Sequence, residues 1–67
     1  MKHLVIEIQT LQDGQIGSIV NAYDTQAEAE SKYHSVLSAA AISKIPAHGA
    51  IILDSNCTPK DWKCYTE

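Results

Sequence analysis

The chain has 67 residues, of which 45% are hydrophobic, and it carries a formal net charge of −3 at pH 7. A chain of this length forms one domain at most, residues 1–67, and buries only about 60% of the surface that its unfolded form exposes. All five basic residues are lysines scattered along the sequence and arginine is absent, which argues against a general nucleic-acid binder.

Residues 3–11 alternate in a pattern that predicts a first strand. The dipeptide Asp13-Gly14 follows and favours a two-residue hairpin loop, so a second strand is expected from about residue 15 to residue 23. This register places Leu4 opposite Tyr23. It gives two apolar faces, one with Leu4, Ile6, Ile8, Ile19 and Tyr23, the other with Val5, Leu11, Ile16, Val20 and Ala22. One helix cannot cover both faces.

Thr25 and Glu28 form a capping-box pattern, which predicts a helix from about residue 26 to residue 43 or 44. Pro46 ends it, because the ring of a proline pushes the preceding residue out of helical geometry. The expected core stripe of this helix is Ala29, Tyr33, Val36, Leu37 and Ala40. Small residues occupy another side of the helix, which is typical either of a solvated face or of close packing against another backbone.

Residues 47–54 predict a third strand that is buried on both faces, and residues 54–61 predict a loop. Residues 62–66 favour a short edge strand, with Trp62 and Cys64 on one face and Lys63 and Tyr65 on the other. The expected fold class is therefore α+β: a small ββαβ(β) domain with an antiparallel sheet and one long helix packed on one face.

The spacing of the three histidines and two cysteines matches no metal-binding pattern, and the three glycines form no phosphate-binding loop. We expect no metal, no cofactor and no enzymatic activity. Cys57 and Cys64 are expected to be free thiols, with a disulfide as the alternative under oxidising conditions. The start of the chain leads directly into a strand and no apolar run approaches 20 residues, so we expect a cytoplasmic protein that does not bind membranes.

The densest polar cluster spans residues 30–34 on the predicted helix. A charge, an aromatic face and a switchable donor lie together there, a combination that suits an anionic or planar ligand. The candidate ligand-binding residues are Glu30, Lys32, Tyr33 and His34, with His48 and Tyr65 as secondary candidates. In the alternative interpretation Tyr33 belongs to the core, and Glu30 and His34 form an exposed helical pair.

The segment from Ala29 to Leu37 resembles a family of small proteins encoded in prophages of Firmicutes. The alanine run after it, Pro46-Ala47-His48, residues 5–10 and Cys64-Tyr65 extend the resemblance over most of the chain, whereas residues 56–59 depart from it. The resemblance implies a phage-related origin and a small accessory role. It also selects the cluster at residues 30–34 over other polar residues.

A small core rarely stabilises a domain alone, so a homo-oligomer is expected. Its candidate interface residues are Val5, Leu11, Ile16, Val20, Ser35, Ser38, Ala39 and Ile42. The favoured function is a homo-oligomeric binding module, with counter-defence by sequestration of a small nucleotide-like ligand as its expected role. The alternatives are a protein–protein inhibitor of a host defence factor, or a structural or assembly accessory of a phage particle.

Overall fold

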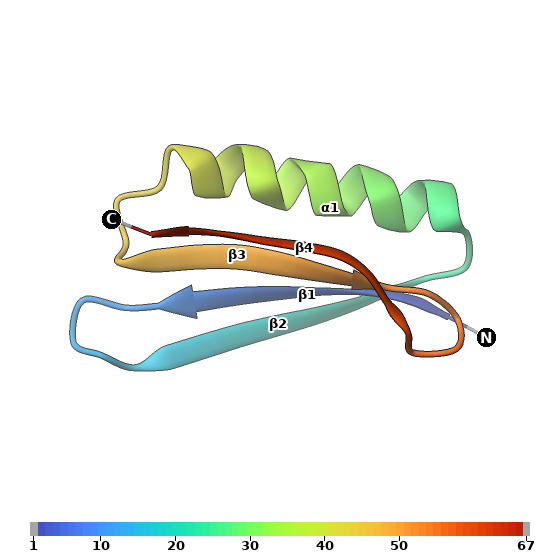
Figure 1. Ribbon diagram of the computed structural model, residues 1–67, viewed down its shortest axis with the longest axis horizontal. Coiled ribbons are helices and arrows are strands. Elements are labelled where there is room, and N and C mark those ends of the chain that lie inside the picture. Colours follow the sequence, from blue (N-terminus) through green and yellow to red (C-terminus); the bar gives the residue numbers. More distant parts are fainter. Residues whose placement is uncertain (1, 67) are drawn as a thin grey trace.

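The computed structural model describes residues 2–66, and its elements follow the order β-β-α-β-β (Figure 1). The strands are β1 (His3–Thr10), β2 (Ile16–Tyr23), β3 (Ala47–Leu53) and β4 (Pro59–Thr66). They form one antiparallel sheet in the order β2-β1-β3-β4, and the helix α1 (Gln26–Ala41) lies along one face of it. The expected α+β class is confirmed, with the final strand longer than predicted.

The hairpin between β1 and β2 has a three-residue loop, and the predicted two-residue loop is wrong. Leu11 N–H donates to Gln15 O, so residues 12–14 form the loop, and Gly14 adopts a positive φ of 88°. A left-handed residue at this position is typical of three-residue hairpin loops. The register is therefore one residue away from the predicted one, and His3, not Leu4, lies opposite Tyr23.

This change of register redistributes the side chains of β2, because neighbouring residues of a strand point to opposite faces. Val20 now shares a face with Ile6, its partner across the ladder, while Ile19 shares the other face with Glu7. Val5, predicted at an interface, lies beneath the helix and is completely buried. The prediction failed because Asp-Gly is compatible with both loop lengths.

Helix α1 begins as predicted, with Thr25 at its N-cap. The Thr25 hydroxyl accepts a hydrogen bond from Glu28 N–H at 3.2 Å and donates to the Glu28 carboxylate at 2.9 Å. The helix ends at Ala41, two to three residues before the predicted end, since Ile42 and Ser43 donate 3₁₀-type bonds to Ala39 O and Ala40 O. Four residues of the predicted stripe are buried and Leu37 is half-buried: Ala29, Tyr33, Val36 and Ala40.

The core lies between α1 and the two central strands. Val5 of β1 and Ala50 and Ile52 of β3 meet the buried stripe of the helix. Several of these side chains are alanines, which let the helix approach the sheet closely and leave a core of small volume. Additional burial elsewhere would therefore stabilise this domain appreciably.

The end of the chain forms a full-length edge strand. Within residues 54–58 the Asp54 carboxylate accepts N–H groups of Asn56 and Thr58, and Cys57 takes a positive φ of 62°. This turn is short, so β4 begins at Pro59 and not at Trp62 as predicted. An irregularity in the pairing lies beside Leu53 and Pro59, and from Asp61 onward the register with β3 is regular.

Gly49 tests how tightly β3 and β4 pack. A Cβ atom added at Gly49 would lie 2.4 Å from Lys63 O and 2.8 Å from Cys64 Cα, both backbone atoms. We expect Gly49→Ala to lower the free energy of unfolding by several kcal/mol. This is a large part of the about 3–5 kcal/mol that the core of a domain of this size supplies. The measurement is urea denaturation followed by circular dichroism.

Gly17→Ala is the matched control, because no heavy atom lies within 4 Å of the position its Cβ would take. We expect its free energy of unfolding to stay within about 1 kcal/mol of the wild type. Equal stability of the two variants would contradict the close approach of β4 to β3.

Candidate functional site

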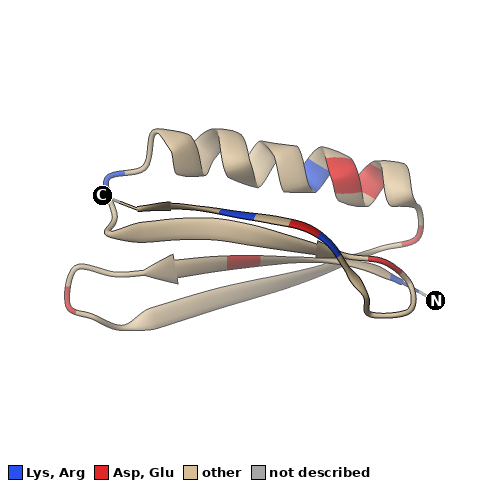
Figure 2. Ribbon diagram, in the orientation of Figure 1, with Lys and Arg blue, Asp and Glu red and all other residues tan. Residues whose placement is uncertain are grey.

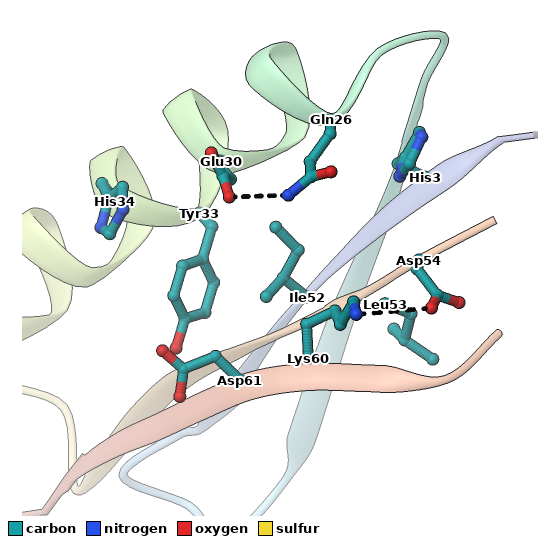
Figure 3. Close-up of a pocket in the computed structure, with 10 residues that line it drawn as sticks. All are labelled: His3, Gln26, Glu30, Tyr33, His34, Ile52, Leu53, Asp54, Lys60 and Asp61. Carbon is teal, nitrogen blue, oxygen red and sulfur yellow. Dashed lines mark hydrogen bonds and ion pairs between the residues drawn. The ribbon is translucent and has the colours of Figure 1, made fainter. Parts of the chain in front are cut away.

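A hollow lies between the first half of α1 and the end of the sheet where β3 turns into β4 (Figure 3). Its volume is about 240 Å³, below the roughly 300–1,000 Å³ of pockets that hold drug-sized molecules. The helix contributes polar side chains and β3 contributes an apolar wall. The complete lining is His3, Gln26, Glu30, Tyr33, His34, Ile52, Leu53, Asp54, Lys60 and Asp61.

Tyr33 stands between Glu30 of the helix and Asp61 of β4 (Figure 3). The side chain is only 2% exposed, and its hydroxyl has no hydrogen-bond partner among the described residues. The Asp61 carboxylate lies beside the hydroxyl, but their geometry falls short of a hydrogen bond. The pKa of Tyr33 is raised, first by burial and then by the negative charge of Asp61. The hydroxyl oxygen itself is closed off from solvent, beside the Asp61 carboxylate.

The carboxylates around the hollow differ in how they are neutralised. Asp54 lies 3.9 Å from the Lys60 ammonium, and the pKa of Asp54 is lowered mainly by the Thr58 and Asn56 N–H groups. Glu30 accepts a bond from the Gln26 amide at 3.1 Å, and Asp61 accepts one from the N–H of the residue after it. No cationic side chain of residues 2–66 lies within ion-pair distance of Glu30 or Asp61. This end of the hollow is therefore negative.

A second polar cluster lies under the helix, nearer the hairpin end of the sheet. Glu7 Oε2 and His48 Nε2 are 2.6 Å apart, and the Gln9 amide lies 3.2 Å from the same Glu7 oxygen. The Glu7 and His48 side chains are only 16% and 8% exposed. The pair holds β1 to β3 through side chains as well as backbone, but the helix covers it. A solute does not reach it from outside, so we assign it a structural role.

The structure separates the predicted ligand residues into three places. Glu30, Tyr33 and His34 belong to the hollow, and His34 meets the Tyr33 ring edge-on with centroids 5.5 Å apart. Lys32 faces a shallow groove on the β2 side of the helix, together with Tyr23, Ser31 and Ser35. His48 is buried with Glu7, and Tyr65 of β4 is its neighbour in the ladder. No hydrogen bond joins Glu30 to His34 in the described part of the chain.

The predicted interface residues also separate. Ile16 and Val20 are exposed on the sheet face opposite the helix, and Leu11 lies just after the end of β1, whereas Val5 is in the core. Ser35, Ser38, Ala39 and Ile42 are exposed on the helix, on the other side of the molecule. A single flat interface cannot contain both exposed groups.

Sequence reasoning missed several lining residues of the hollow: Gln26, Asp54, Lys60 and Asp61. Three of these follow the third strand, in the part predicted as a loop. The helical spacing of Gln26, Glu30 and Tyr33 offered the one usable signal, because residues three and four apart share a helix face. The pairing of β4 with β3, which brings Asp61 to the same place, had no local signal.

Among residues 2–66, no three His, Cys, Asp or Glu side chains are close enough together to hold a metal ion. Cys57 and Cys64 are both free and exposed. In the same part of the chain, no helix has the length and apolar character needed to cross a membrane. Comparisons with protein-family models, with curated proteins and with solved structures gave no match. The prophage-family resemblance therefore stays a prediction, and geometry alone bears on function.

The Glu7–His48 pair makes a prediction about acid stability. The pKa of Glu7 is lowered from its ordinary value of 4.5, chiefly by the hydrogen bond to His48. A carboxyl whose pKa is lower in the folded state stabilises the fold fully above about pH 4.5, and the contribution is lost as pH falls through the folded-state pKa. We expect Glu7→Gln to be less stable at pH 7 and to lose less on acidification than the wild type.

Thermal unfolding between pH 7 and about pH 3 measures this difference. Asp13→Asn is the control, because Asp13 is an exposed carboxylate in the hairpin loop whose bond to Gln15 N–H an amide oxygen can replace. Its pH profile should follow that of the wild type. If Glu7→Gln lost stability on acidification as steeply as the wild type does, the Glu7–His48 pair would contribute nothing to the pH dependence of stability.

Proposed function

We propose that the protein is a non-enzymatic binding module that acts as a homo-oligomer through the face of its sheet that α1 leaves open. This open face is defined by the strand registers. It contains Leu4, Ile6, Ile8, Thr10, Ile16, Ser18, Val20, Ala22, Ala47, Gly49, Ile51, Leu53, Trp62, Cys64 and Thr66. The hollow lies on the helix side of the sheet and shares only Leu53 with the open face.

The observation that carries the proposal is the composition of the open face. None of its residues is charged, although 19% of the chain is charged. Ile16, Val20 and Trp62 are 74%, 60% and 69% exposed, and five more large aliphatic residues lie between them. A contiguous apolar surface of this kind marks an interaction site. Figure 2 shows the charges on the helix, the loops, β1 and β4, and none on β2.

A second copy of the chain is the occupant that fits this surface best. Four strands about 4.8 Å apart, with roughly 3.3 Å per residue, give a face of about 500 Å². Two copies stacked face to face would bury about 1,000 Å² in total, the lower limit for a specific interface. A surface without charges has nothing to pair with a charged partner, whereas it is complementary to itself around a two-fold axis.

The ligand and the biological role are further parts of the proposal. The counter-defence role depends on the prophage resemblance and on capture of a small molecule in the hollow. A nucleotide-like ligand stays a prediction, and the unpaired carboxylates of Glu30 and Asp61 give it no support because they repel phosphate. Inhibition of a host protein is the alternative, in which the open face binds that protein instead of a second copy.

Val20→Lys tests the oligomer, because it places an ammonium at an exposed position of the open face, within the edge strand β2. The monomer should fold normally, since the side chain is free to reach water. Burial of an unpaired charge in the interface costs several kcal/mol, so the dissociation constant should rise by more than about tenfold. Sedimentation equilibrium measures it.

Ile42→Lys is the matched control, since Ile42 is 84% exposed at the end of the helix, on the other side of the sheet. It introduces the same charge and should leave the dissociation constant within about twofold. Equal weakening by both variants would point to net-charge repulsion, and no weakening by Val20→Lys would remove the open face from the interface.

A further inference from the structure

The two edges of the sheet differ in how they are protected against pairing with another strand. β4 carries Pro59, Lys60, Asp61 and Lys63, and its pairing with β3 is irregular near its start. Prolines, charges and bulges are the usual devices that keep an edge strand from pairing with another chain. β2 contains no proline and no charged residue, and its register with β1 is regular along its whole length. β2 is therefore an unprotected edge.

The backbone of β2 has hydrogen-bonding groups that no other strand of residues 2–66 reaches. Leu11 N–H donates to Gln15 O, which makes these two residues a hydrogen-bonded pair at the end of the ladder with β1. Hydrogen-bonded and non-hydrogen-bonded pairs alternate along an antiparallel ladder, so every second residue of β2 turns its N–H and C=O away from β1. Figure 1 shows no element of the described chain on that outer side. The outward-facing residues are all exposed: Ile16, Ser18, Val20 and Ala22.

We propose that β2 pairs antiparallel with β2 of a second copy, so that two four-stranded sheets become one continuous sheet around a two-fold axis perpendicular to it. Residues opposite each other in such a ladder share a face, and the register with Ile19 at the axis meets this condition. Ile16 then pairs with Ala22 of the second copy. Ser18 pairs with Val20, and the axis repeats both pairs. Every outward-facing residue thereby gains a partner, through about eight backbone hydrogen bonds in all.

A second copy fits this edge without a charge to bury or to repel. Ile19 is 53% exposed on the helix side of β2, and in this register it lies against its own counterpart. The two Ile19 residues form a non-hydrogen-bonded pair, which brings their Cα atoms to about 4.5 Å, the closer of the two spacings. Asp24, the first charged residue after the strand, is already paired with Lys2. The helix leaves the edge accessible, because its buried stripe packs on the central strands β1 and β3.

Edge pairing also enlarges the open face, and this consequence rests on the proposed function. Stacking of two single chains, each with a face of about 500 Å², reaches only the lower limit for a specific interface. The perpendicular two-fold axis leaves both open faces on the same side, so two chains joined through β2 present about 1,000 Å². Two such pairs stacked together would bury about 2,000 Å² in total, the upper end of the range for standard stable interfaces.

The test is amide hydrogen exchange, measured by NMR on the ¹⁵N-labelled protein at millimolar concentration. The same alternation, followed through β1 and β3, gives the outward-facing amides of the other edge, which serve as the internal control: Trp62, Cys64 and Thr66. The outward-facing amides of β2 should exchange at least about 100-fold more slowly than these, because an amide in a ladder exchanges only when the ladder opens. Equal rates at the two edges would overturn the proposal, and so would protection that appears only after a different protein is added.

Ile19→Lys breaks the edge pairing and leaves the open face unchanged, because Ile19 lies on the helix side of β2. Two ammonium groups would face each other across the axis, and like charges directly opposite destabilise a ladder. The β2 amides should then exchange nearly as fast as those of β4. Asn56→Lys introduces the same charge at an exposed position in the turn between β3 and β4, and should keep the protection. Equal loss of protection in both variants would reduce the effect to net charge and overturn the proposed register.

Edge pairing and stacking of the open face are tested separately. Val20 belongs to both surfaces, whereas Trp62 lies on the open face at the far edge, so Trp62→Lys disturbs the stacking alone. The β2 amides of Trp62→Lys should stay protected while its assembly stops at two chains in sedimentation equilibrium. Unprotected β2 amides in a wild-type protein that still self-associates would contradict only the edge pairing. Protected β2 amides in a wild-type protein that already stops at two chains would contradict only the stacking.

Discussion

A single helix covers only one face of a four-stranded sheet, and most properties of this domain depend on that constraint. The helix-facing side holds all of the completely buried apolar residues, and it also tolerates the polar cluster of Glu7, Gln9 and His48 because α1 shields it. The other side is left with aliphatic residues and Trp62 in contact with water. Since apolar burial is the main favourable term in folding, a domain with so small a core gains most from covering that second side.

The same constraint explains where the hollow lies. The helix packs closest over the central strands, where Ala29, Ala40 and Ala50 allow a near approach. Beside the turn between β3 and β4, Tyr33 of the helix and Asp61 of β4 line the hollow. Its negative end is thus a consequence of the packing of α1 on the sheet, which places Glu30 of the helix and Asp61 of β4 in the lining of one hollow.

The sequence predicted those parts of the fold that have local causes. The capping residue Thr25, the stripe from Ala29 to Ala40 and the alternation in β4 each depend on neighbours within one element, and the structure agrees with them. The predicted hairpin register was wrong because Asp13-Gly14 is compatible with loops of two or three residues. A shift of one residue in the register exchanges the two faces of the strand. The sequence predicted only part of the lining of the hollow. Glu30 and Tyr33 were selected, but Asp61 comes from a strand whose pairing no local pattern encodes.

The central claim is that the open face is buried against a second copy, and the single tryptophan of the chain reports on it directly. Trp62 lies on that face and is mostly exposed in one chain. Its fluorescence emission should shift to shorter wavelength as the protein is concentrated from the nanomolar to the millimolar range, with a midpoint that Val20→Lys moves to higher concentration. Emission typical of a water-exposed indole at every concentration would contradict the account, because the face would then remain uncovered.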